Sequence, residues 1–196
     1  MNNSITTDNY IFSIKNSLSS SLCDSIIKRF EEEPNKKEGV TFLGLNKDIK
    51  RTYDFHLSMN PDNWRDLDLV LVNELSKAID LYLIHINKDI PILTIDNCND
   101  LGFQIQKYEK GVGNYIFHND GHINYENRSS RFLTYIWYLN TIQEGGETHF
   151  YDRGKIKPEK GKLCLFPASW TYPHAGIMPI SDDKYIITGW IYKEFG

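Results

Sequence analysis

Two stretches in the first half of the chain place hydrophobic residues at the spacing of an amphipathic helix. Residues 18–33 begin with serines that can act as N-caps, and Pro34 ends the pattern. The expected apolar face of this first helix is Leu22, Ile26, Ile27 and Phe30. Residues 61–83 give the stronger pattern, with Pro61 at the start. The expected apolar stripe of this second helix is Trp64, Leu67, Leu71, Leu75, Ala78 and Tyr82.

Strand-like alternation of apolar and polar residues dominates after about residue 100, although residues 51–59 already show it. The later expected strands cover residues 101–108, 114–120, 131–140, 146–152, 161–167 and 184–193. This pattern predicts an α+β fold, a double-stranded β-helix (jelly roll) with the N-terminal helices packed on one sheet. We expect one domain, in which residues 1–99 form a helical support region and residues 100–196 form the jelly-roll core.

Composition narrows the functional classes. The 196 residues are 40% hydrophobic and carry a net charge of −4 without a large basic cluster, which argues against a nucleic-acid binder. No apolar run approaches the roughly 20 residues that span a bilayer, and we see no secretory signal. The three cysteines are far apart, so a disulfide framework or a cysteine zinc site is not expected. A cytoplasmic location fits best, and the richness in Ile, Asn and Lys favours a bacterial or viral source.

Ionisable side chains in residues 114–122 are the first sign of chemistry. If this run is a strand, His118 and Asp120 lie on the same face and converge on one side. A third candidate ligand, His174, follows a later strand. Two imidazoles and one carboxylate are the ligand set of non-haem Fe(II) oxygenases. His122 has the same parity, but a glycine precedes it and a polar stretch follows, so we expect it in a surface loop.

A lysine opens the last expected strand. Parity places Lys184, Ile186, Thr188 and Trp190 on one face of that strand. A lysine on an inward face is costly to bury unless an anion meets it. A dicarboxylate cosubstrate would supply that anion.

The order of these residues resembles that of the 2-oxoglutarate- and Fe(II)-dependent dioxygenases, and among them the prolyl 4-hydroxylase-like group. The resemblance covers about residues 100–192. It includes a Tyr-Leu-Asn strand end at residues 138–140, a Gly-Gly-x-Thr strand at residues 145–148, and His174 followed ten positions later by Lys184. The Tyr, Gly, Tyr, His-x-Asp order of the family corresponds to Tyr108, Gly111, Tyr115, His118 and Asp120.

The resemblance implies a role for each matched position. His118, Asp120 and His174 would bind Fe(II) and form the catalytic centre. Lys184 would pair with the distal carboxylate of 2-oxoglutarate, and Tyr138 would hydrogen-bond to it. The other expected cosubstrate positions are Tyr108 near the metal-binding end and the wall residues Thr148, Thr188 and Trp190. Parity turns His149 outward if Thr148 faces the pocket.

The activity implied is hydroxylation of an unactivated C–H bond, with consumption of O2 and release of succinate and CO2. A prolyl residue of a peptide or protein is the favoured substrate, and ascorbate is the expected reductant. Two alternatives stay open: the same chemistry on a small molecule such as a free amino acid, and a jelly-roll binding module without turnover. Substrate contacts are expected from Arg131, Trp170 and Tyr172, although loops with aromatic residues are common.

Overall fold

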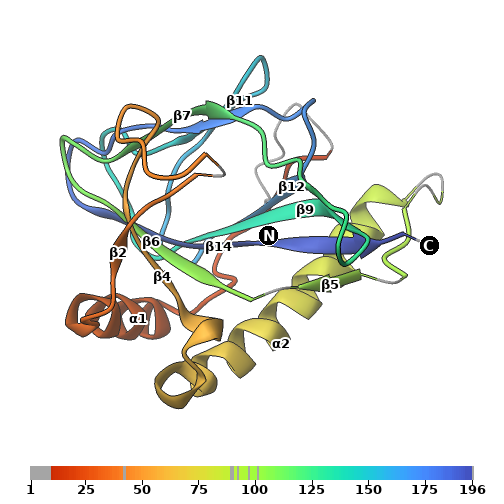
Figure 1. Cartoon of the computed structure of the whole chain (residues 1–196), viewed down its shortest axis with the longest axis horizontal. Coiled ribbons are helices and arrows are strands. Elements are labelled where there is room, and N and C mark those ends of the chain that lie inside the picture. The colour runs from red at the N-terminus through yellow and green to blue at the C-terminus, as the bar shows by residue number, and fades with distance from the viewer. Residues whose placement is uncertain are drawn as a thin grey trace.

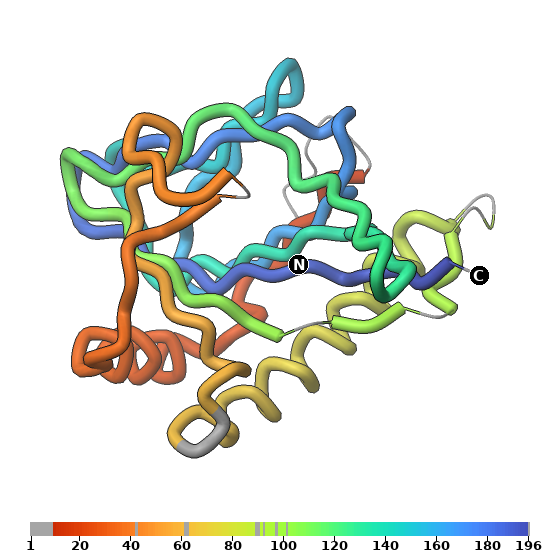
Figure 2. Tube along the Cα trace, viewed as in Figure 1, coloured from red at the N-terminus to blue at the C-terminus, as the bar shows by residue number. Residues whose placement is uncertain are grey.

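Two β-sheets face each other, and both helices lie on the outer side of the larger sheet (Figures 1 and 2). This computed structural model describes residues 10–41, 43–88, 91, 93–96, 98–100 and 102–195. The arrangement is the expected α+β jelly roll with helices packed on one sheet.

The larger sheet has the strand order β1-β12-β9-β14-β6-β4-β2, with β5 paired to β14 and β8 paired to β9. All of the pairings described are antiparallel. The strands are β1 (Phe12–Ile14), β2 (Lys37–Glu38), β4 (Tyr53–His56), β5 (Cys98–Asp100), β6 (Gln104–Tyr108), β8 (Ile123–Asn124), β9 (Ser129–Tyr138), β12 (Leu163–Pro167) and β14 (Lys184–Glu194).

The smaller sheet has the order β11-β10-β13-β7-β3 and covers the inner face of the larger one. Its strands are β3 (Lys50–Arg51), β7 (Asn114–His118), β10 (Thr148–Phe150), β11 (Gly154–Ile156) and β13 (His174–Gly176). The chain passes from β3 in this sheet to β4 in the larger sheet with only Thr52 between them, so the two sheets are joined closely at that edge.

The two helices form where the hydrophobic spacing places them. Helix α1 (Ser20–Glu32) begins after Ser19, whose hydroxyl accepts a hydrogen bond from the main-chain N–H of Leu22. Helix α2 (Pro61–Ile86) follows a 3-10 turn, η1 (Leu57–Met59). Every residue of the expected stripe on α2 is buried, which confirms that prediction. Neither helix in the described part of the chain has an apolar stretch long enough to cross a membrane.

Strand parity divides the interior into two cores. Alternate residues of β14, such as Tyr185 and Ile187, pack with α1 and α2 in a core outside the larger sheet. Ile186 points to the opposite side, into a second core between the sheets. The helices therefore bury the outer face of the larger sheet, and its inner face is free to carry polar groups.

Three segments differ from the expected pattern. The N-terminal support region contributes strands to both sheets as well as helices: β4 extends the larger sheet beside β6, and β3 forms the edge of the smaller sheet beside β7. Residues 51–59 form the end of β3, then β4 and η1, rather than one strand. The polar segment around His122, which was expected to be a surface loop, includes a hairpin, because β8 pairs with the start of β9.

Leu71 tests the outer core, because it is fully buried between α2 and the sheet. Leu71→Ala should lower the free energy of unfolding by about 2–5 kcal/mol, since the substitution leaves a cavity. Leu69 lies on the same helix and is 62% exposed. Leu69→Ala should therefore change stability by less than about 0.5 kcal/mol. Urea denaturation followed by circular dichroism measures both, and equal losses would show that the α2 interface is misplaced.

Candidate metal centre

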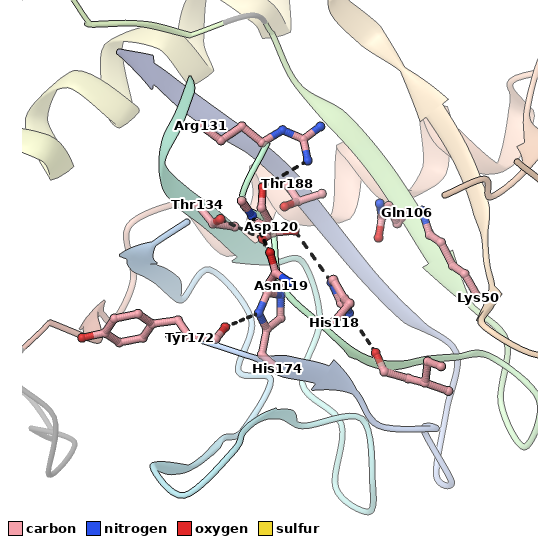
Figure 3. Close-up of polar contacts among 12 residues, drawn as sticks. Lys50, Gln106, His118, Asn119, Asp120, Arg131, Thr134, Tyr172, His174 and Thr188 are labelled. Atoms are coloured by element: carbon pink, nitrogen blue, oxygen red, sulfur yellow. Dashed lines mark hydrogen bonds and ion pairs between the residues drawn. The ribbon is translucent and has the colours of Figure 1, made fainter. Parts of the chain in front are cut away.

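Pairing of β7 with β13 brings two histidines face to face. His118 is the last residue of β7 and His174 the first of β13, and the two are direct partners in the ladder. Asp120 lies two residues beyond the end of β7 and turns its carboxylate between the two imidazoles (Figure 3). Its Oδ1 is 3.7 Å from His118 Nε2, and its Oδ2 is 3.5 Å from His174 Nε2. The three candidate ligand atoms lie within 4.8 Å of one another.

Hydrogen bonds fix the tautomer of both histidines. Nδ1 of His118 lies 2.8 Å from the carbonyl oxygen of Ile116, and Nδ1 of His174 lies 3.1 Å from that of Tyr172. A carbonyl only accepts hydrogen bonds, so each Nδ1 must carry the proton and each Nε2 presents its lone pair to the centre. Metal-binding histidines are held in this way.

The electrostatics of the three groups also suit a cation. Burial lowers the pKa of His118 well below its usual range, and the neighbouring His174 lowers it further, so its imidazole stays neutral. Burial raises the pKa of Asp120, but the two histidines and a hydrogen bond from Thr134 outweigh that effect and lower it. A neutral imidazole and an ionised carboxylate are the forms that bind metal.

A cavity between the sheets opens beside these ligands. Side chains from β6, β7, β9, β10, β13 and β14 surround it, so both sheets contribute to its walls. The lining residues other than the three ligands are Gln106, Tyr108, Tyr115, Thr134, Ile136, Thr148, Gly176, Lys184, Ile186, Thr188 and Trp190.

Lys184 is the one cation in that lining, and it is 1% exposed. Its Nζ donates a hydrogen bond to the carbonyl oxygen of Gly146 at 3.0 Å and lies 3.9 Å from the centroid of the Tyr108 ring. Within the described residues no carboxylate forms an ion pair with it. Burial lowers the pKa of Lys184 to about 7, against a weaker opposing effect from Glu147. A buried ammonium without a counter-ion makes the cavity a site for an anion.

Comparison with known proteins relates the second half of the chain to one family. Residues 103–192 match the family model described as the 2OG-Fe(II) oxygenase superfamily. This part of the chain is similar to that superfamily. Oxygenases of that superfamily use Fe(II), 2-oxoglutarate and O2. The structure fits these groups, because the donor set of the triad suits Fe(II) and the cavity beside it holds a buried cation for a carboxylate.

Solved structures with the same fold include several prolyl hydroxylases. The viral collagen prolyl hydroxylase of Paramecium bursaria Chlorella virus-1 is 23% identical, with coverage of 94% of this chain and 96% of that one and a TM-score of 0.65. A prolyl hydroxylase from Trichoplax adhaerens, in complex with a hypoxia-inducible-factor peptide fragment, is 20% identical, with coverage of 94% and 84% and a TM-score of 0.70. A Pseudomonas putida prolyl-4-hydroxylase is 19% identical, with coverage of 92% and 91% and a TM-score of 0.66. Curated protein sequences gave no significant match.

The cavity includes most of the positions expected to hold the cosubstrate. Tyr108, Thr148, Thr188 and Trp190 line it directly. Tyr138 is fully buried behind that lining, and its hydroxyl is 2.6 Å from Thr148 Oγ1, so it reaches the cavity through that threonine. Among the described residues, the indole Nε1 of Trp190 is a buried polar side-chain atom without a hydrogen-bond partner.

The three expected substrate residues occupy different environments. The Arg131 guanidinium lies 3.5 Å from the centroid of the Trp190 ring and donates to the Tyr192 hydroxyl at 3.0 Å. Trp170 is 78% exposed, on the loop before β13. Tyr172 is buried in the core between the sheets, and its carbonyl oxygen accepts the hydrogen bond from Nδ1 of His174.

The remaining histidines lie outside the triad. The group of possible metal ligands found in the described residues does not include His122, which is in the connection between β7 and β8. His149 follows Thr148 on β10, and its ring packs against Phe117, with the centroids 5.1 Å apart.

A buried polar chain reaches the cavity from the far edge of the larger sheet, and sequence reasoning missed it. Lys50 Nζ donates to Asp54 Oδ2 at 2.5 Å, and both side chains are buried. Gln104 donates to the same carboxylate oxygen at 3.0 Å, Gln106 donates to Gln104 at 2.9 Å, and the Tyr108 hydroxyl donates to Gln106 at 3.2 Å. Alternate positions of β6 therefore carry polar groups inward, a period-2 signal that could have been read from the sequence.

The direction of this chain follows from its carboxylate end. Because a carboxylate only accepts hydrogen bonds, Gln104 must turn its amide nitrogen toward Asp54 and its oxygen toward Gln106. Each following group then donates toward Asp54. Burial raises the pKa of Tyr108, so its hydroxyl keeps the proton that it donates.

Removing one partner of this buried pair should cost stability. Asp54→Ala leaves the Lys50 ammonium buried and unpaired, and we expect the free energy of unfolding to fall by about 3–5 kcal/mol. The double variant Lys50→Met/Asp54→Leu removes both charges with little change in volume. It should recover most of the loss. Urea denaturation of the three proteins measures this, and a single variant as stable as the wild type would mean that the pair is exposed to water.

Proposed function

We propose that the protein is a 2-oxoglutarate- and Fe(II)-dependent dioxygenase that hydroxylates an unactivated C–H bond, with a prolyl residue of a peptide or protein as its substrate. Succinate and CO2 would be released, and ascorbate would serve as reductant. The observation that carries the proposal is one cavity with a His-Asp-His triad at one end and a buried lysine without a counter-ion in its wall. The triad is suited to a metal ion, and the buried lysine is suited to an anion.

His118, Asp120 and His174 would hold Fe(II) by three ligand atoms, which leaves other coordination positions for the cosubstrate and O2. Bound Fe(II) would supply the electrons that activate O2, the oxidant in the reaction. The protein would contribute ligand orientation through the two Nδ1 hydrogen bonds and a site in which Asp120 and His174 are buried. Among the residues described, the triad gathers no fourth side-chain ligand, as this chemistry requires.

Lys184 would bind the distal carboxylate of 2-oxoglutarate. Its ammonium is already desolvated and oriented by Gly146, so a carboxylate entering the cavity would replace the missing counter-ion. The hydroxyl pair of Tyr138 and Thr148 would hydrogen-bond to the same carboxylate, and Tyr108, Thr188 and Trp190 would form the walls. Ile136 and Ile186 supply the apolar surface around the ligand.

Support for a peptide substrate comes from the neighbours in fold. The similar structures are prolyl hydroxylases, and that from Trichoplax adhaerens is in complex with a peptide. On this chain, Arg131 and Trp190 stack beside the triad, and Trp170 is exposed on the loop before His174. These three residues would contact the substrate.

Succinate release tests the reaction and its substrate class together. The protein is incubated with Fe(II), ascorbate and 2-oxoglutarate, with proline-rich peptides or with free amino acids. Stimulation by peptides and a mass increase of one oxygen on proline support the proposal. Stimulation only by a free amino acid would transfer the same chemistry to a small molecule, and binding of 2-oxoglutarate without turnover would favour the binding module.

Removing a triad ligand should abolish succinate production and leave the fold intact. His118→Ala and Asp120→Ala each delete one of three protein ligands, so both should reduce turnover to background while circular dichroism stays unchanged. His122→Ala is the matched control, because His122 lies near the triad in sequence but is not part of it. A triad variant with wild-type turnover would refute the metal assignment.

Lys184 should govern cosubstrate affinity and leave metal affinity unchanged. Loss of one partner from a desolvated charge pair costs about 2–5 kcal/mol, so Lys184→Ala should weaken 2-oxoglutarate binding by roughly thirtyfold or more. Lys184→Arg should lose less, because it keeps the charge in another shape. Titrations with Mn(II) in place of iron prevent turnover and give both affinities. Equal 2-oxoglutarate affinity in all three proteins would remove Lys184 from the site.

The affinity for 2-oxoglutarate should also depend on pH. The pKa of Lys184 is about 7 in the free protein, so the ammonium is present below that pH and is lost above it. Above about pH 7, binding must be accompanied by proton uptake, and affinity should fall by up to about tenfold per pH unit. Lys184→Arg stays charged throughout, so its affinity should not show this fall. The same Mn(II) titration, repeated at steps of about one pH unit between pH 6 and pH 9, measures this fall in affinity. An identical pH profile in both proteins would contradict the mechanism.

A further inference from the structure

Asp120 lies outside the strand pairing that holds the other two candidate ligands. His118 and His174 are fixed as partners in the β7–β13 ladder. Asp120 follows the end of β7 and belongs to no strand. Loop segments hold a side chain less firmly than a ladder does, so other contacts must set the position of this carboxylate.

Those contacts come from β9, in the opposite sheet. Thr134 Oγ1 donates a hydrogen bond to Asp120 Oδ2 at 2.8 Å, and Thr134 is 1% exposed (Figure 3). Arg131, three residues earlier on β9, directs Nη1 toward the main-chain carbonyl oxygen of Asp120 at 3.5 Å. One strand thus holds both the side chain and the main chain of Asp120.

The hydrogen bond from Thr134 distinguishes the two carboxylate oxygens. Oδ2 accepts a hydrogen bond from the threonine hydroxyl. Oδ1 lies near Nε2 of His118, which carries no proton, and no hydrogen-bond donor to Oδ1 is seen among the described residues. Thr134 therefore fixes the rotation of the carboxylate about its last bond and leaves Oδ1 as the oxygen available to a cation. The neighbouring β9 residues Leu133 and Tyr135 are buried in the outer core, which holds Thr134 rigidly in place.

We propose that Thr134 is a positioning residue for the metal centre, and that its hydroxyl sets the affinity of the site by orienting Asp120 across the gap between the sheets. This inference rests on the metal-binding role given to the triad under the proposed function. A hydrogen bond to a ligating carboxylate commonly changes metal affinity by about 10–100-fold.

Thr134→Val tests the proposal, because valine keeps the shape of threonine and lacks the hydroxyl. Mn(II) affinity, measured by electron paramagnetic resonance of the free ion, should fall by about 10–100-fold. Thr134→Ser restores a hydroxyl at the same place and should bind Mn(II) within about threefold of the wild type. If Thr134→Val fails to fold, Thr134→Ala and Thr134→Ser give the same comparison.

Thr188→Val is the matched control for removal of a buried hydroxyl. Thr188 also lines the cavity, but its Oγ1 donates to the main-chain carbonyl of Tyr135 at 2.9 Å and not to a ligand. Mn(II) affinity should stay unchanged in that variant. A general effect of losing a hydroxyl in the cavity would weaken Mn(II) binding equally in both valine variants, and that result would overturn the proposal.

The outcome separates this inference from the proposed function. Thr134→Val with wild-type Mn(II) affinity overturns the role of Thr134 and leaves the triad and the oxygenase reaction in place. Wild-type protein that does not bind Mn(II) overturns both. Weaker binding in Thr134→Val, rescued in Thr134→Ser, supports the role of Thr134, because a purely structural residue would change the melting temperature of the metal-free protein without changing metal affinity.

Discussion

The antiparallel pairing of β7 with β13 is the interaction on which the site depends. It sets His118 opposite His174 at one end of the smaller sheet, and the turn after β7 then brings Asp120 between them. The Nδ1 of each histidine is oriented by a carbonyl two residues earlier in its own chain. The His118 ring also stacks on Tyr115, and the His174 ring packs edge-on against Phe166. The geometry of two short strands thus determines both the spacing of the ligands and the nitrogen that each presents.

The division of the larger sheet into an outer and an inner face allows a polar interior. The helices supply the outer face with a complete hydrophobic core, which includes Trp64, Leu71 and Phe30. The inner face can then hold Lys184 and the Asp54 chain, groups that weaken a core unless their hydrogen bonds are satisfied. The outer side of these strands packs in the hydrophobic core, and the inner side carries the polar groups of the candidate site.

Much of this arrangement could be read from the sequence because it depends on local periodicity. The stripe on α2 has helical spacing, and parity along β14 places Lys184 on the same side as Thr188 and Trp190. What could not be read depends on partners that are distant in sequence. Asp54 and Gln104 meet across a pairing of β4 with β6 that no local pattern specifies. The contact between Thr134 and Asp120 could not be read from the sequence either, because it joins one sheet to the other.

Central strand β14 lies between β9 and β6, and its inward side chains include Lys184 while its outward side chains pack under the helices. Insertion or deletion of one residue near its start would exchange the two sets, with inward residues moved into the apolar core and outward residues such as Tyr185 and Ile187 moved into the cavity. Such a change would damage folding and ligand binding together, whereas substitutions along the strand affect one or the other. Over evolutionary time, length variation should therefore collect in connections outside the strands and the triad, such as residues 43–49 and 125–128. New binding properties can arise in those connections without disturbing the strands that carry His118, His174 and Lys184.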